Sequence, residues 1–293
     1  KRCADYDFYG IAGSVADDSQ YVQDRRDSDY LMEDVVKDAI KMKMQELCFT
    51  DHVDYGIKYD VNQLSKEEME RISKERGLLL LNVDYDHYFK ELARLQQKYP
   101  QITIKRGLEF GIQTHTIPQY QKLIQKYDLD FVILSCHQVD NLEFWTQDFQ
   151  KGKTQQEYNE RYYQEILDVI EQFKDYQVLG HLDLIKRYDQ AGIYPFEKIK
   201  DIVSKILKQV IRDGKGIEVN TSSHRYGLDD LMPSRDILKH YYQLGGTIIT
   251  IGSDSHQPDH LGAYIKETRK ELKEIGFKYY CTFDHKKPIY HPL

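Results

Sequence analysis

The segment Phe131-Val132-Ile133-Leu134-Ser135 is a nearly continuous apolar stretch, and Cys136-His137 follows it directly. It lacks the alternation of polar and apolar residues that a strand with one face in water shows. An apolar strand of this kind is typical of a sheet that is buried on both faces, as in a parallel sheet or a barrel. The histidine that follows places a candidate metal ligand where the strand ends.

The same pattern continues on both sides of this stretch, because strand-like segments alternate with amphipathic helical ones. The predicted strands are 46–50, 102–110, 131–135, 177–180, 216–220, 247–251 and 279–283. The predicted helices are 31–44, 82–99, 118–127, 154–173, 196–212, 234–244 and 265–275. Such βα alternation predicts a parallel sheet or barrel. No linker, repeat or low-complexity segment divides the chain, so we expect one barrel domain over residues 1–293.

Composition narrows the class of protein. With 40% hydrophobic and 30% charged residues, the 293-residue chain is not of the disordered type and can bury a large core. The absence of an apolar run of about 18 residues predicts no transmembrane helix. The net charge of −7 argues against a nucleic-acid binder held mainly by phosphate contacts. The four cysteines are widely scattered, which favours a reducing, cytoplasmic setting.

Potential metal ligands stand at the ends of five separate predicted strands. They are His52, Glu109, His137, His181, and Asp254 with His256. Each of these residues alone is a weak signal. In a closed βα barrel, however, the carboxyl ends of all strands meet at one face, where active sites are built. Imidazole and carboxylate ligands together suit Zn, Mn or Fe, so the set predicts a site for two or three divalent metal ions.

Charge supports the same interpretation. Glu109 and Asp254 brought to one face would repel each other, and one of them would take up a proton unless cations were present. Divalent ions remove that repulsion, hold a phosphate group and lower the pKa of a bound water. We therefore expect phosphoester hydrolysis, with Glu109, Asp254 and His256 as candidate catalytic residues.

Two arginines follow strand ends on the same expected face. Arg187 comes six residues after His181, and Arg225 follows the stretch 220–224. Guanidinium groups match phosphate oxygens bidentately, which favours a small phosphorylated substrate. The alternative is that both arginines are ordinary surface cations.

These segments resemble the polymerase-and-histidinol-phosphatase (PHP) superfamily, and within it the bacterial histidinol-phosphate phosphatase branch. The resemblance runs from about Asp27 to the C-terminus. The motifs that carry it are Phe49-Thr50-Asp51-His52, Gly107-Leu108-Glu109-Phe110, Ser135-Cys136-His137, Gly180-His181-Leu182-Asp183, Glu218-Val219-Asn220-Thr221-Ser222 and Gly252-Ser253-Asp254-Ser255-His256. As a set, these motifs are highly specific.

The resemblance implies a distorted (β/α)7 barrel of the TIM-like type with a three-metal site. The implied reaction is hydrolysis of L-histidinol phosphate to L-histidinol and phosphate, in histidine biosynthesis. Another small phosphomonoester is the alternative substrate.

The resemblance also implies a role for each candidate residue. Glu109 would bridge two metal ions, and Asp254 would hold the first of them. His137 and His181 would complete the second metal site. The implied ligands of the third metal are His52, His256 and Asp27, and the implied phosphate ligands are Arg187 and Arg225.

The N-terminal segment 1–26 departs from the family pattern. The family opens with His-x-His in its first strand, whereas this chain has no histidine before His52. Three registers place Asp7 and Tyr9, Gly10 and Ala12, or Ser19 and Tyr21 at the two ligand positions. The third leaves the right distance to the helix at 31–44 and makes Asp27 the third-metal aspartate, so it is preferred.

Three interpretations of this departure stay open. The segment is the product of a frameshift or a wrong start, or the protein is a diverged homologue that binds metal or phosphate with little turnover. In the third interpretation, carboxylates such as Asp17 and Asp18 replace the histidines.

Overall fold

The structure is a computed structural model that describes residues 9–12, 30–76 and 79–293. Its centre is a sheet of seven parallel strands that follow one another in chain order. They are β1 (Tyr9–Ala12), β2 (Glu46–Val53), β3 (Thr103–Gly111), β4 (Phe131–Ser135), β7 (Val178–Leu179), β8 (Gly216–Asn220) and β9 (Ile249–Gly252). The last strand, β9, also contacts β1, which brings the two edges of the sheet together. The predicted barrel is confirmed, but its strands differ from the predicted set at both ends. The strand β1 was not predicted from periodicity, and the predicted strand at 279–283 lies outside this sheet.

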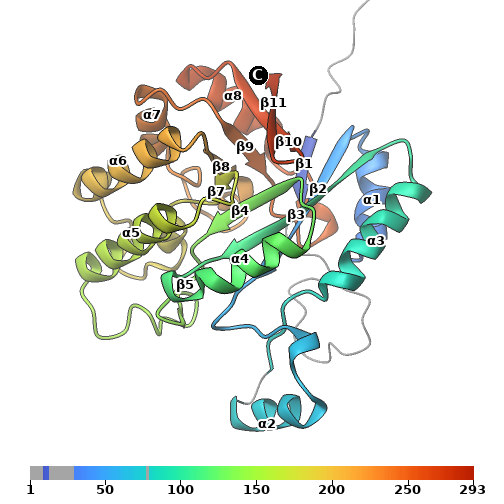
Figure 1. Cartoon of the computed structure of the whole chain (residues 1–293). Coiled ribbons are helices and arrows are strands. Elements are labelled where there is room, and N and C mark those ends of the chain that lie inside the picture. The colour runs from blue at the N-terminus through green and yellow to red at the C-terminus, as the bar shows by residue number, and fades with distance from the viewer. Residues whose placement is uncertain (1–8, 13–29, 77–78) are drawn as a thin grey trace, which may run out of the picture.

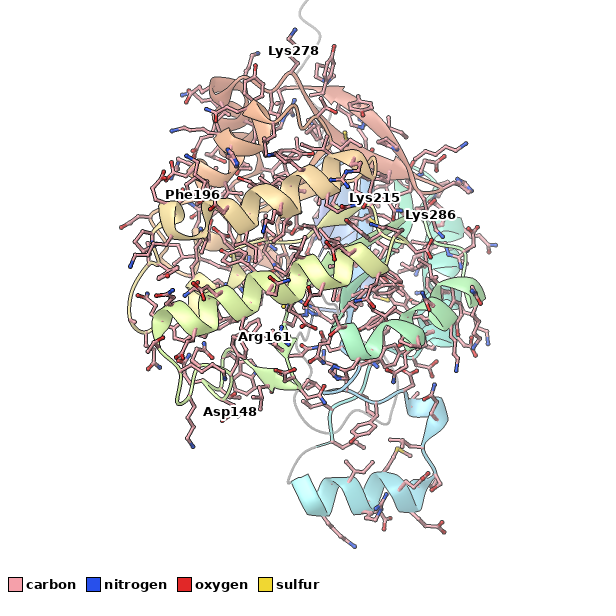
Figure 2. The ribbon with its side chains drawn as sticks, turned by 60° about the vertical axis from the view of Figure 1, so that its left-hand side comes forward. Asp148, Arg161, Phe196, Lys215, Lys278 and Lys286 are labelled. Carbon is pink, nitrogen blue, oxygen red and sulfur yellow. The ribbon has the colours of Figure 1, made fainter. Side chains whose placement is uncertain are left out.

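Helices surround this sheet and connect its strands (Figure 1). They are α1 (Met32–Lys41), α3 (Tyr85–Lys98), α4 (Ile117–Lys126), α5 (Gln155–Gln172), α6 (Phe196–Arg212), α7 (Arg235–Gln243) and α8 (Ile265–Ile275). Each helix buries its apolar side; α6, for example, buries Val203, Ile206 and Val210. Figure 2 shows α5 and α6 side by side, with Phe196 at the start of α6. Among the described residues, no helix combines the length and apolarity needed to cross a membrane.

The distortion of the barrel is concentrated at β7. This strand has only two residues, whereas the sequence predicts a strand over 177–180. It pairs with β4 and with β8 through the same two residues, Val178 and Leu179. The backbone N–H of Gly180 still donates a 2.9 Å hydrogen bond to the carbonyl oxygen of Leu134, so His181 follows directly after the last backbone bond to β4.

Helix starts follow local capping chemistry. The Thr154 side chain accepts a hydrogen bond from the backbone N–H of Glu157, and the Glu157 carboxylate accepts one from the N–H of Thr154. At the start of α7, the Ser234 hydroxyl accepts a hydrogen bond from the backbone N–H of Ile237. The helix predicted to begin at Asn82 begins at Tyr85 instead, because the side chain of Asn82 bonds to Asp54 and Asp60.

Several described elements lie outside the predicted set. They are β1, α2 (Lys66–Arg76), β5 (Gln138–Val139), β6 (Leu142–Glu143), β11 (Lys287–Pro292), and the 3-10 helices η1 (Val61–Gln63), η2 (Thr114–Thr116), η3 (Leu184–Tyr188), η4 (Thr221–Ser223) and η5 (Pro258–His260). Charged residues dominate α2, so it lacks the apolar periodicity that predicts a helix; it stands away from the barrel in both views. The strand β11 pairs antiparallel with β10 (Tyr279–Asp284), which contacts β9.

The first strand bears on the N-terminal registers. Gly10 and Ala12 lie in β1, opposite Leu47 and Phe49 of β2. Tyr9 begins the same strand. The positions Asp7, Asp17, Asp18, Ser19, Tyr21 and Asp27 lie outside the described residues, so the preferred register and the role of Asp27 stay predictions.

Candidate metal centre

Glu109, near the end of β3, contacts histidines from three other segments. Its Oε1 atom lies 3.1 Å from Nε2 of His137 and 2.9 Å from Nε2 of His181. Its Oε2 atom lies 3.7 Å from Nε2 of His52. The hydroxyl of Ser135 donates a hydrogen bond of 2.6 Å to Oε1. One buried carboxylate therefore joins the ends of β2, β3, β4 and β7.

His52 connects this group to a second one. Its potential ligand atoms lie within 4.8 Å of those of Glu109 and His137, and also within 4.8 Å of those of Asp254 and His256. The His52 ring centroid is 4.7 Å from that of His137 and 6.2 Å from that of His256. The six-residue cluster, as we call His52, Glu109, His137, His181, Asp254 and His256, is thus continuous.

The position of His52 differs from the prediction in one respect. The predicted strand ends at Thr50, whereas β2 runs on to Val53 because Asp51 and His52 pair with Leu108 and Glu109 of β3. His52 is therefore a strand residue directly beside Glu109. This pairing sets the register in which the imidazole and the carboxylate meet.

Asp54, which the sequence analysis did not single out, orients His137. Its Oδ1 atom lies 2.7 Å from Nδ1 of His137, and its Oδ2 atom lies 3.2 Å from Nζ of Lys58. Metal-binding histidines commonly use their second ring nitrogen on a carboxylate in this way, which leaves the other nitrogen for the metal. A signal for Asp54 was present in the sequence, because it follows His52 by two residues, the spacing at which an extended chain places side chains on one face.

Glu218 of β8 is a second residue that the sequence analysis left without a role. It is buried, and its Oε2 atom accepts a 3.2 Å hydrogen bond from the backbone N–H of His181. Burial, together with the charges of Glu109 and Asp254, raises the pKa of Glu218 to about 8. A carboxyl group of this kind is mostly protonated at neutral pH.

The other carboxylates of the site are ionised in spite of their burial. Burial opposes the charge of Glu109, but His52, His137 and His181 outweigh it and hold its pKa well below the usual range. Burial likewise opposes the charge of Asp254, and nearby His256 and Arg225 lower its pKa. The site therefore holds two ionised carboxylates close together, and bound cations would balance their negative charge.

This donor set fits divalent metal ions. Imidazole nitrogens and carboxylate oxygens from separate strands face one another within the spacing that a shared cation needs. The Nδ1 atom of His181 is buried and has no hydrogen-bond partner among the described residues. Burial opposes the charge of His137, yet Asp54 and Glu109 raise its pKa to about 10. Because histidine binds metal in its neutral form, a cation displaces that proton.

The two predicted arginines lie beside the cluster. Nη2 of Arg225 is 3.2 Å from Oδ2 of Asp254. Arg187, on η3, donates a hydrogen bond to the hydroxyl of Ser222. The ring centroid of Tyr226, which is 52% exposed, lies 4.0 Å from the guanidinium carbon of Arg187 and 5.6 Å from that of Arg225. The two cations therefore flank one aromatic ring at the solvent edge of the site.

Comparison with known proteins agrees with this arrangement. A family model described as the PHP domain matches residues 21–222, which is more than half of the chain. The chain belongs to the PHP family. The resemblance inferred from the sequence motifs is thereby confirmed.

Two relatives that match most of this PHP protein are histidinol-phosphatases or probable ones. The histidinol-phosphatase of Lactococcus lactis subsp. lactis is 30% identical over 274 residues, which cover 89% of this chain and 91% of that protein. A probable histidinol-phosphatase of Thermotoga maritima is 27% identical and covers 88% of this chain and 91% of its own length.

A solved structure extends the comparison. The crystal structure of histidinol phosphate phosphatase from Lactococcus lactis subsp. lactis, complexed with Zn, L-histidinol and phosphate, has a TM-score of 0.76 at 27% identity. The similarity covers 96% of this chain and 98% of that one. The PHP fold of this chain is therefore shared over nearly its whole length.

Proposed function

We propose that this protein is a metal-dependent phosphomonoesterase that hydrolyses L-histidinol phosphate to L-histidinol and phosphate, in histidine biosynthesis. The observation that carries the proposal is Glu109, a buried carboxylate that contacts His52, His137 and His181 from three other segments. The histidinol-phosphatases that match most of the chain support the choice of substrate.

The residues of the proposed site have separate roles. The proposed metal ligands are His52, Glu109, His137, His181, Asp254 and His256, with Asp27 from the undescribed segment. Glu109 would hold two neighbouring metal ions, and Asp54 keeps His137 turned towards Glu109. When bound, divalent metal ions neutralise phosphate charge and make a water molecule more acidic.

Zn is the proposed metal, in two or three copies, because the similar Lactococcus lactis structure contains it. The alternatives from ligand chemistry are Mn and Fe. The arginines Arg187 and Arg225 lie on one side of the cluster, where they can receive the phosphate of a small substrate.

A reducing, cytoplasmic setting is part of the proposal. Cys48, Cys136 and Cys281 are buried thiols that form no disulfide within the described part of the chain. The net charge of −7 argues against a nucleic acid held mainly by phosphate contacts. It leaves room for a small phosphorylated substrate, because local cations such as Arg187 and Arg225 decide whether that binds.

The Glu109→Gln variant tests the proposal directly. An amide cannot share negative charge between two cations, so we expect kcat on L-histidinol phosphate to fall by about 100-fold or more. Phosphate release is measured for wild type and variant with Zn, Mn and Fe added in turn. Exposed Glu171→Gln on α5 is the matched control and should keep wild-type turnover.

Two results would contradict the proposal. One is a wild-type protein that binds metal but releases no phosphate from L-histidinol phosphate with any of the three metals. The other is a Glu109→Gln variant with unchanged turnover at saturating metal.

A further inference from the structure

Asp254 has an unusual backbone conformation. Its φ is +48°, in the left-handed region, which residues with a Cβ atom rarely adopt because the Cβ approaches the carbonyl oxygen. It lies two residues beyond the end of β9 at Gly252. The direction of its carboxylate therefore depends on contacts outside the strand ladder.

Arg225 makes those contacts from the neighbouring strand end. Its Nη1 atom donates a 2.9 Å hydrogen bond to the carbonyl oxygen of Ser253, and its Nη2 atom donates a 2.6 Å bond to that of Asp254. Nη2 also lies 3.2 Å from Oδ2 of Asp254. One planar guanidinium thus holds the backbone before and after the strained residue, and its carboxylate as well.

Arg187 has a different environment. Its Nη2 atom donates to the hydroxyl of Ser222, and its guanidinium lies on the ring of Tyr226. Its Nε atom is buried and has no hydrogen-bond partner among the described residues. Arg187 therefore holds a desolvated donor that a phosphate oxygen can satisfy.

We propose that the two arginines have distinct roles: Arg225 is a positioning residue that holds Asp254 towards the six-residue cluster, and Arg187 is the principal phosphate ligand. This inference rests on the proposed function, since it assigns separate roles to two residues of that site. It revises the symmetrical assignment of both arginines to the phosphate.

Simple electrostatics makes the opposite prediction for Arg225. A positive charge beside a metal ligand weakens cation binding, so removing that charge would tighten zinc binding. If positioning dominates, removing Arg225 weakens zinc binding instead. The sign of the effect therefore separates the two explanations.

The test compares Arg225→Met, Arg225→Lys and Arg187→Met with the wild-type protein. Zinc per chain and zinc affinity are measured after dialysis against buffered Zn²⁺. Binding of inorganic phosphate to the zinc-loaded protein is measured by calorimetry. Circular dichroism establishes which variants fold, and kcat and KM are measured on L-histidinol phosphate.

We expect Arg225→Met to lose tenfold or more in affinity for its weakest zinc ion and to lower kcat. Arg225→Lys should behave similarly, because one ammonium cannot bond to two carbonyl oxygens in the geometry of a fork. Arg187→Met should keep its zinc, while its dissociation constant for phosphate and its KM rise tenfold or more. If Arg225→Met does not fold, Arg225→Lys carries the test.

The inference is overturned if Arg225→Met binds zinc as tightly as the wild type or more tightly. It is also overturned if Arg225→Lys restores wild-type zinc affinity, since charge alone would then suffice, or if Arg187→Met loses zinc equally. Zinc and phosphate binding are measured in experiments that do not require catalytic turnover. A protein inactive on L-histidinol phosphate would therefore contradict the proposed function and leave this test intact.

Discussion

Glu218 differs from the other carboxylates of the site because its surroundings keep it protonated. Its neighbours Glu109 and Asp254 are ionised, and the backbone N–H of His181 donates a hydrogen bond to its Oε2 atom without supplying a positive charge. Burial and these two charges raise its pKa from the ordinary 4.5 to about 8. Three neighbouring carboxyl groups therefore hold two different protonation states.

This pKa predicts how stability depends on pH in the metal-free protein. Between about pH 4.5 and 8 the folded state keeps a proton that the unfolded state has lost, so stability falls as the pH rises through this window. The Glu218→Gln variant lacks this dependence. We expect its advantage in free energy of unfolding over the wild type to grow from pH 5 to pH 8 and then level off.

Urea unfolding at several pH values, after removal of metal, checks this expectation. Glu171→Gln, on the exposed side of α5, is the control that changes the same functional group outside the site. Parallel curves for Glu218→Gln and the wild type across the window would show that Glu218 is not held protonated.

At the scale of elements, strand ends set the geometry of the cluster. Gly111 ends β3 where the strand passes Asp54 and His137. A Cβ atom at this position would overlap Oδ1 of Asp54 and lie 2.9 Å from Nδ1 of His137. The absence of a side chain at Gly111 therefore leaves the room in which the carboxylate meets the imidazole.

The Gly111→Ala variant should separate Asp54 from His137. Carboxylates that orient metal-binding histidines contribute about 10- to 100-fold in metal affinity, so we expect a loss of that size. Zinc content and affinity are the measurements. Gly214→Ala is the control: its φ is +65° with open space around it, so it should lower stability by about 1 kcal/mol and leave zinc binding unchanged. Wild-type zinc affinity in Gly111→Ala would refute the role of this contact.

At the scale of the whole molecule, barrel closure joins residues that are distant in the chain. The six-residue cluster draws on the ends of β2, β3, β4, β7 and β9, and a metal ion held there would contact several of them at once. Because these ligands come together only in the folded state, metal binding stabilises that state.

Chelation should therefore lower the melting temperature. A ligand present at 100 times its dissociation constant stabilises the folded state by about 2.7 kcal/mol, so removing the metal should cost several degrees. Calorimetry with EDTA, and then with Zn²⁺ restored, measures the effect. Glu109→Gln should show a smaller shift, and an equal shift in that variant would place the stabilising metal elsewhere.

The sequence by itself predicted the βα order from β2 to β9, the positions of seven helices to within a few residues, and the residues of the six-residue cluster, but not β1 or the charged helix α2. These follow from local periodicity and from the rule that parallel strand ends share one face. The family and the barrel are confirmed, whereas the single domain over 1–293 and the role of Asp27 stay predictions.

Only the tertiary structure decided which side chains act on one another. Asp54 and His137 are 83 residues apart in the chain, and their contact exists because β2, β3 and β4 lie side by side. The raised pKa of Glu218 and the hydrogen bonds from Arg225 to Asp254 likewise depend on neighbouring strands. Periodicity reports which face a residue occupies, but contact distances and burial arise only when the strands pair and the barrel closes.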